Sequence, residues 1–281
     1  MIKIYLITKL YNLDDKIRTC ELEKYLKENF EVEIYMPFRD TKEENISQEK
    51  WKSDIFKEDI IRLNECDIVV GFNEFVFDEG IGFEIGYALS IGKTITLFNS
   101  DFISYSVFNK QHKNPDPLFE YFDIQIVKGL HDLDYDRFCD SLKVKKQQML
   151  NELKFDKVKE KEDIEVLKLS NTFLEIGNCK YFYELYKDKN ISKRLVSWDA
   201  LGDIKNIKSS KKVYVVLDGH QIHIGSSMVC GLCYGWDIPF YMIDNRTVSL
   251  VGKELMRSNL MIDVATSGYI SMKEFLDEYS Y

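Results

Sequence analysis

The chain has 281 residues, of which 45% are hydrophobic and 30% charged, a composition that predicts a soluble globular protein of one or two domains. Its net charge of −9 argues against a nucleic-acid surface, and no apolar run approaches membrane-spanning length. Residues 1–9 predict a strand and not a secretory signal, so the six cysteines indicate reduced thiols and a cytoplasmic location.

The first half of the chain alternates between apolar runs and segments with helical spacing. Strands are expected over residues 2–8, 30–35, 67–72, 93–98 and 124–127, and helices over 13–29, 51–64 and 83–91. This alternation predicts an α/β fold with a parallel sheet and helices on both of its faces. Residues 133–163 are polar and of mixed charge, and we expect a solvated helix that runs into a linker, with no binding role for the basic run 143–146.

The second half has glycines and Asn or Asp residues at the same relative positions as the first half, at an offset of 145 residues. The matched pairs are Gly80 and Gly225, Gly86 and Gly231, Asn73 and Asp218, and Asn114 and Asn259. In this repeat, the apolar run 212–217 corresponds to 67–72, and the run 239–243 corresponds to 94–98. We therefore predict two flavodoxin-like or Rossmann-like parallel-sheet domains in tandem, over residues 1–145 and 160–281, that pack as a pseudo-dimer.

An acidic motif, Asp78 to Ala88, follows the strand at 67–72. Gly80 and Gly82 suit a tight loop, which would place Glu84 in the first turn of a helix just beyond the carboxyl end of a parallel strand. A carboxylate pair, Asp78 and Glu84, suits nucleophilic attack at a sugar carbon, although a carboxylate here could also serve only as a helix cap. The second half has His223 and Val229 at these two places, so we expect one working site per chain.

Several segments resemble the nucleoside 2-deoxyribosyltransferase family, within the wider group of N-glycosidases. The resemblance lies in the segments 3–6, 55–60 with 66–70, 78–80 with 83–88 and 92–93, and 259–262. It implies that Glu84 attacks the anomeric carbon of a nucleoside and that Asp78 gives a proton to the leaving base. It further implies that Asp59 binds the base and that Tyr5 orients Glu84 through its hydroxyl. Without the resemblance, Tyr5 fits a core aromatic equally well, and the pattern favours a solvated helix carboxylate for Asp59.

The resemblance also implies a set of substrate-binding residues. The second half would close the site of the first, as a neighbouring subunit does in dimers of the family. Two departures concern substrate choice: an Asn stands at 73 where the family commonly has Asp, and an Ile at 81 where it has Thr. The implied substrate-binding residues are Asn73, Gly80, Gly82, Asn259 and Met261.

Four residues of the second half could suggest a zinc site: His220, His223, Cys230 and Cys233. The two cysteines lie on a predicted helix that should face the sheet, where small buried thiols need no metal. We therefore expect no metal and no cofactor.

Three functions remain open from the sequence. The first is transfer of a (deoxy)ribosyl group between bases. The second is hydrolysis of a nucleotide or of NAD, as in a toxin or defence effector, and the third is a non-catalytic nucleotide-binding module. Each implies a nucleoside or nucleotide as the small-molecule partner, without nucleic acid or membrane, and the oligomeric state is left open.

Overall fold

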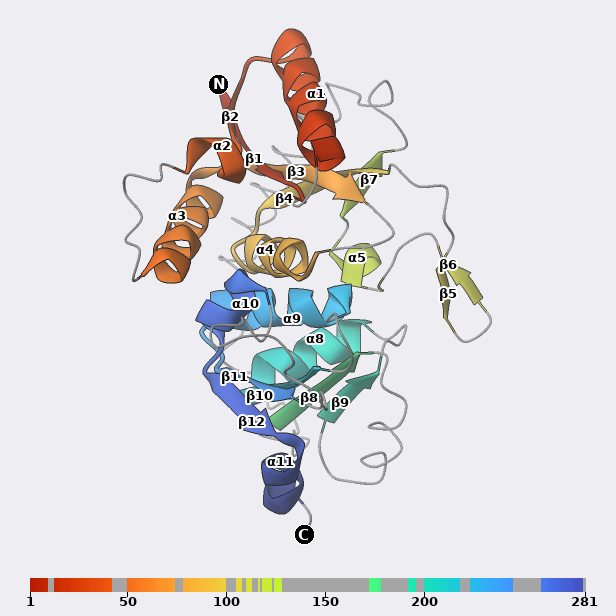
Figure 1. Cartoon of the computed structure of the whole chain (residues 1–281). Helices are drawn as coiled ribbons and strands as arrows, with labels where there is room; N and C mark the ends of the chain where they lie inside the picture. Colours follow the sequence, from red (N-terminus) through yellow and green to blue (C-terminus); the bar gives the residue numbers. More distant parts are fainter. Residues whose placement is uncertain are drawn as a thin grey trace, which may run out of the picture.

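Figure 1 shows the computed structural model of the chain, which describes residues 1–9, 13–41, 50–73, 78–99, 105–107, 110–112, 116, 118–122, 124–127, 172–177, 192–195, 200–217, 223–244 and 259–279. Within these residues the fold contains two five-stranded parallel sheets and a short antiparallel hairpin of β5 (Tyr105–Val107) and β6 (Lys110–His112). The predicted α/β class with parallel sheets is confirmed.

The first sheet has the order β2-β1-β3-β4-β7. Its strands are β1 (Ile2–Ile7), β2 (Val32–Tyr35), β3 (Ile68–Asn73), β4 (Thr94–Asn99) and β7 (Gln125–Val127). Its helices are α1 (Leu13–Asn29), α2 (Pro37–Asp40), α3 (Trp51–Glu65), α4 (Glu79–Ser90) and α5 (Leu118–Tyr121). Successive side chains of a strand point to opposite faces, so Ile4 and Leu6 pack with residues of α1 while Tyr5 and Ile7 pack with residues of α3 and α4.

The second sheet has the order β9-β8-β10-β11-β12, which is the same order of chain positions as in the first sheet. Its strands are β8 (Thr172–Gly177), β9 (Ser192–Leu195), β10 (Lys212–Leu217), β11 (Phe240–Asp244) and β12 (Gly268–Ser271). The helices among the described residues of this half are α8 (Ala200–Ser209), α9 (Ile224–Gly235), α10 (Leu260–Ala265) and α11 (Met272–Tyr279).

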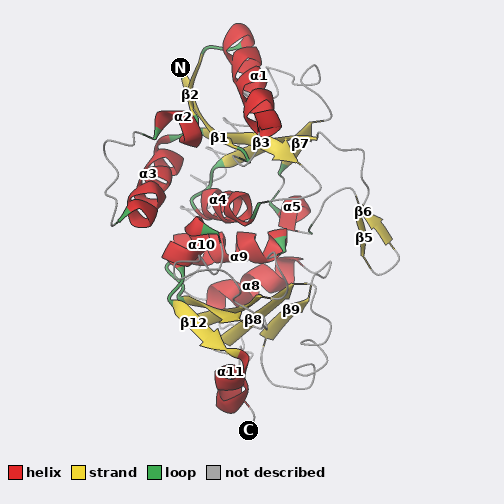
Figure 2. Cartoon of the chain, in the orientation of Figure 1, coloured by secondary structure: helices red, strands yellow, loops and turns green. Residues whose placement is uncertain are grey.

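The two halves meet through α4 and α9, which lie between the sheets (Figures 1 and 2). Small residues allow the two backbones to touch: a Cβ on Gly86 would lie 2.0 Å from the carbonyl oxygen of Met228, and one on Gly231 would lie 2.0 Å from that of Phe83. These contacts are reciprocal at the offset of 145. One continuous apolar cluster contains residues of both halves, so the interface between them is part of the protein core.

The ends of α4 and α9 repeat one another in detail. Gly92 has a φ of 75° and Asp237 a φ of 57°, the left-handed conformation that closes many helices. In both turns the next residue donates its N–H to a helix carbonyl five positions back, from Lys93 to Ala88 and from Ile238 to Cys233. One extra residue follows in the second half, so β11 begins at Phe240, one position later than the predicted strand.

The start of α4 differs from the prediction. The helix begins at Glu79 with Asp78 as its N-cap, so Gly80 and Gly82 lie in its first turn and not in a loop. Glu84 consequently lies in the second turn. Each of these glycines faces a close neighbour, Asn259 for Gly80 and Ser227 for Gly82. This tertiary packing overrides the low helix propensity of glycine.

Some expectations fall outside the described residues, namely the segment 133–163, the proposed domain boundary within it, Asn114 and His220. Among the helices that the structure describes, none is both long enough and apolar enough to cross a membrane.

Candidate active site

The centre of the candidate site is a buried hydrogen bond between β1 and α4. The hydroxyl of Tyr5 donates to Glu84 Oε1 over 2.9 Å. Tyr5 is fully buried and Glu84 is 9% exposed, although each carries a polar group. Burial, followed by the nearby carboxyl of Asp59, raises the pKa of Glu84 well above the ordinary carboxyl range. The same two causes raise the pKa of Tyr5, so its hydroxyl keeps its proton and acts as the donor.

A second buried carboxyl joins this pair from α3. Asp59 is 5% exposed, and its Oδ1 atom has no hydrogen-bond partner in the described structure. Burial raises the pKa of Asp59 from 3.8 to about 7. Two carboxyl groups that are close together in a poorly solvated place do not both ionise at low cost. The cluster of Tyr5, Asp59 and Glu84 can therefore hold and exchange a proton near neutral pH.

Asp78, which the family resemblance made the proton donor, is the N-cap of α4. Its Oδ1 atom accepts hydrogen bonds from the backbone N–H groups of Gly80, at 2.7 Å, and of Ile81, at 3.3 Å. The same oxygen accepts from Asn259 Nδ2 at 3.1 Å. Asp78 is thus an acceptor that fixes the start of α4, and among the charges acting on Glu84 that of Asp59 outweighs that of Asp78.

Two residues of the second half that the sequence analysis singled out are Asn259, which lies against Asp78, and Met261, which lies in the shared core. Asn259 is the N-cap of α10, and its Oδ1 atom accepts from the backbone N–H of Met261 over 2.9 Å. Met261 is 4% exposed in the shared core. Asp78 and Asn259 are 181 residues apart in the sequence, and they meet only because the two halves pack together.

The two predicted glycines of the site permit close approach. A Cβ on Gly80 would lie 2.7 Å from Asn259 Oδ1, and one on Gly82 would lie 2.6 Å from the Cβ of Ser227. Asn73 is the last residue of β3 and so lies at the carboxyl edge of the sheet, where open α/β sheets bind their ligands. A small pocket at the same edge, between the ends of β1 and β3, is lined by Thr8, Lys9, Asp15, Arg18, Phe72 and Ile81, among others.

The sequence did not single out Tyr35, which supports Tyr5. Its ring lies 5.4 Å from the ring of Tyr5, and its hydroxyl is 2.8 Å from that of Thr41. The guanidinium group of Arg62 lies 5.3 Å from the centre of the Tyr35 ring. The only signal in the sequence is its position, at the end of a strand and two residues before a proline that begins α2.

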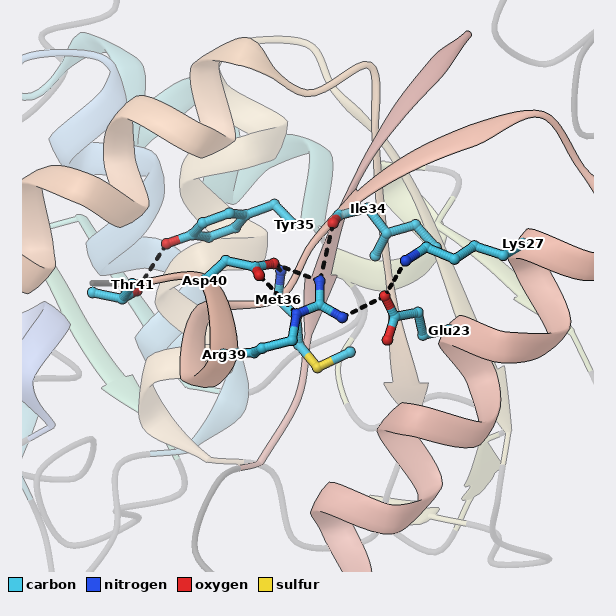
Figure 3. Close-up of polar contacts among 8 residues, drawn as sticks. All are labelled: Glu23, Lys27, Ile34, Tyr35, Met36, Arg39, Asp40 and Thr41. Carbon is cyan, nitrogen blue, oxygen red and sulfur yellow. Dashed lines mark hydrogen bonds and ion pairs between the residues drawn. The ribbon is translucent and has the colours of Figure 1, made fainter. Parts of the chain in front are cut away.

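Arg39 fixes α2 at this edge of the sheet (Figure 3). Its guanidinium donates from Nε and Nη2 to both carboxylate oxygens of Asp40, each at 2.7 Å. It also pairs with Glu23 of α1, which accepts a further hydrogen bond from Lys27. Bidentate pairs of this kind restrict side-chain orientation, so α2 is held against both α1 and β2.

The corresponding corner of the second half lacks the carboxylates. Strand register places Leu174 at the position of Tyr5, and Val229 occupies the position of Glu84. The N-cap of α9 is His223, which accepts from the N–H of Gly225. Cys230 and Cys233 are buried in the shared core, and no group of three or more potential metal ligands occurs among the described residues.

Asp116 corrects one detail of the predicted repeat. Its Oδ1 accepts from the backbone N–H of Leu118 at the start of α5, as Asn259 does for Met261 at the start of α10. Its Oδ2 lies 3.6 Å from Nδ1 of His223, the N-cap of α9. By contacts, Asp116 therefore corresponds to Asn259, where the sequence offset of 145 had chosen Asn114.

Comparison with known proteins finds similarity to one family over the first half of the chain. Residues 4–130 match the family model described as nucleoside 2-deoxyribosyltransferase. Among solved structures, a 2-deoxyribosyltransferase from Bacillus psychrosaccharolyticus is 20% identical and matches with a TM-score of 0.37, covering 48% of this chain and 94% of that one. The NAD⁺-bound 3-phosphoglycerate dehydrogenase of Entamoeba histolytica is 13% identical, with a TM-score of 0.22, covering 88% of this chain and 82% of that one. No curated protein matches the chain.

Proposed function

We propose, from the match of residues 4–130 to the nucleoside 2-deoxyribosyltransferase family model, that the chain transfers a 2-deoxyribosyl group from one base to another through a covalent bond to Glu84. The observation that carries the proposal is the buried cluster in which Glu84 accepts the Tyr5 hydroxyl beside Asp59. A structural role alone gives no reason to bury two carboxyl groups together, because their burial is costly.

In the first step, the proton that the two buried carboxyl groups share lies on Asp59, and Glu84 attacks C1′ of the nucleoside as the carboxylate, the form that burial disfavours in the free protein. Tyr5 binds Oε1, which leaves Oε2 as the attacking atom. An ester bond forms between Oε2 and C1′ while the bond from C1′ to the base nitrogen breaks, and its electron pair stays on that nitrogen. The transition state resembles an oxocarbenium ion, which a carboxylate stabilises.

The leaving base must gain a proton, and Asp59 is the better source. Its pKa of about 7 leaves a large protonated fraction near neutral pH, while Asp78 Oδ1 is occupied as an acceptor. In the second step, an incoming base attacks C1′, the ester bond breaks, and Glu84 leaves as a carboxylate. The N–H proton of the incoming base returns to Asp59, which completes the cycle.

The second half contributes to the same site in this proposal, as a degenerate copy of the first. Asn259 and Met261 close the site from α10, in the way that a second subunit would, and the chain forms a pseudo-dimer with one working site. The identical order of strands and the reciprocal contacts of Gly86 and Gly231 support this interpretation.

One incubation series tests the reaction. The chain is incubated with deoxyinosine, with and without adenine, then with dAMP and with NAD, and the products are separated by chromatography. We expect new deoxyadenosine only when adenine is present. Free base alone would assign the chain to the hydrolases, and no product from any substrate would favour a nucleotide-binding module.

The role of Glu84 is tested by trapping. The denatured reaction mixture of the wild type should contain a peptide with residue 84 that has gained the mass of a deoxyribosyl group. Glu84→Gln keeps the shape and the acceptor for Tyr5, but it should lose activity by about a thousandfold or more and form no adduct. An adduct on another residue, or a fully active variant, would refute the proposed nucleophile.

A further inference from the structure

Glu79, the first residue of α4, contacts the other half of the chain. Its Oε2 atom accepts the backbone N–H of Asn259 over 2.9 Å. The side-chain Nδ2 of the same asparagine donates to Asp78 Oδ1 over 3.1 Å. Two donors of one residue are thus matched by two adjacent carboxylates, and together they attach the start of α10 to the start of α4.

These contacts fix the direction of the Asn259 amide. Its Oδ1 atom accepts the N–H of Met261, so the Nδ2 atom must face the first half of the chain. The backbone N–H of Asn259 precedes the helix and has no carbonyl within α10 to bind, which makes an external acceptor necessary. Glu79 supplies that acceptor, and Gly80 leaves the space, since a Cβ there would meet the Asn259 amide.

The equivalent corner of the second half is built without this contact. The residue that corresponds to Glu79 at the offset of 145 is Ile224, whose side chain cannot accept a hydrogen bond. There, Asp116 Oδ2 lies 3.6 Å from Nδ1 of His223. Among the described residues, the contact of a carboxylate with the backbone N–H of the capping residue therefore occurs on the side that has Glu84, and Ile224 cannot make it on the side that has Val229.

We propose that Glu79 is a positioning residue for the transfer reaction, which holds Asn259 against Asp78 at the site; this rests on the proposed function. Glu79 acts through Asn259 and touches no reacting atom. A bound geometry that is wrong by about 1 Å can cost on the order of a hundredfold in rate, so a residue that fixes α10 affects turnover more than stability.

Three variants test this role. Glu79→Ala removes the acceptor, and Glu79→Gln keeps an acceptor oxygen without the charge. The matched control is Lys52→Met, which removes a second contact between the halves, the ion pair of Lys52 Nζ with Asp263 Oδ2 at 3.1 Å, one turn further along α10. For each we measure kcat and KM for transfer from deoxyinosine to adenine, and the hydrogen-exchange rate of the Asn259 backbone amide.

We expect Glu79→Ala to lower kcat about tenfold with KM within about twofold, and to speed exchange at Asn259. Glu79→Gln should recover most of kcat, and Lys52→Met should change neither kcat nor the exchange of that amide by more than about twofold. An equal loss in Lys52→Met, a Glu79→Gln as impaired as Glu79→Ala, or unchanged kinetics in Glu79→Ala would overturn the proposal. If the wild type transfers no deoxyribosyl group, the proposed function fails, while exchange at Asn259 still decides whether Glu79 holds this residue.

Discussion

Replacing Asp59 by Asn should inactivate the protein and stabilise it at the same time. The folded protein raises the pKa of Asp59 from 3.8 to about 7, mainly by burial. A shift of about 3 units corresponds to about 4 kcal/mol, as an order of magnitude, when one unit is worth about 1.4 kcal/mol. Because the folded-state pKa is the higher one, this carboxyl favours folding while it is protonated, and its contribution is lost as the pH rises toward 7. Asp59→Asn cannot ionise and so avoids the loss.

Urea unfolding at pH 4 and at pH 8 measures the effect. Relative to the wild type, Asp59→Asn should gain up to about 4 kcal/mol in the free energy of unfolding between these two pH values. Glu58→Gln removes a charge from the same helix, where Glu58 forms a partly exposed pair with Arg62, and its effect should stay within about 1 kcal/mol. If the difference between Asp59→Asn and the wild type is the same at both pH values, Asp59 is not a proton-holding group of the folded protein, and its proposed acid role is refuted.

Two further predictions concern the contact between the halves. Gly86→Ala places a Cβ 2.0 Å from the backbone carbonyl oxygen of Met228, which cannot rotate away. The variant should therefore have a free energy of unfolding lower by about 3 kcal/mol. Thermal unfolding that matches the wild type would contradict the close helix packing. Asn259→Ala should lower kcat/KM by about ten- to a hundredfold and stability by only about 1 kcal/mol, the value of a lost helix cap. Asn259→Asp separates the two roles, because it keeps the cap oxygen for Met261 and loses the donor to Asp78; wild-type kinetics in both Asn259 variants would remove this residue from the site.

The start of α4 shows a limit of prediction from local sequence pattern. Gly80 and Gly82 have low helix propensity, so the sequence favoured a loop, and the helix was expected to begin later. In the structure both glycines are helical because Asn259 and Ser227 approach them too closely for any side chain. Their partners lie more than 140 residues away in the chain, and no local rule takes such contacts into account.

The role of Asp78 shows the same limit. Two carboxyls six positions apart, at 78 and 84, suggested a catalytic pair, and the family resemblance made Asp78 the proton donor. In the structure Asp59, which comes from another helix, has a larger effect on the pKa of Glu84 than Asp78 has, and Asp78 is a helix cap that binds Asn259. Sequence spacing cannot show which carboxyl acts more strongly on Glu84, since α3 and α4 become neighbours only when both pack on β1.

The sequence by itself determined the alternation of strands and helices, the parallel sheet, the repeated glycine and Asn or Asp positions of the two halves and the residues of the acidic motif. These follow from apolar periodicity, which depends only on the geometry of a strand or a helix. Tertiary structure alone decided that Tyr5, Asp59 and Glu84 share one buried environment, that Glu79 and Asp78 bind Asn259, and that Tyr35 supports Tyr5. Burial and charge proximity set pKa values and hydrogen bonds, and both are properties of the packed core and not of any single segment.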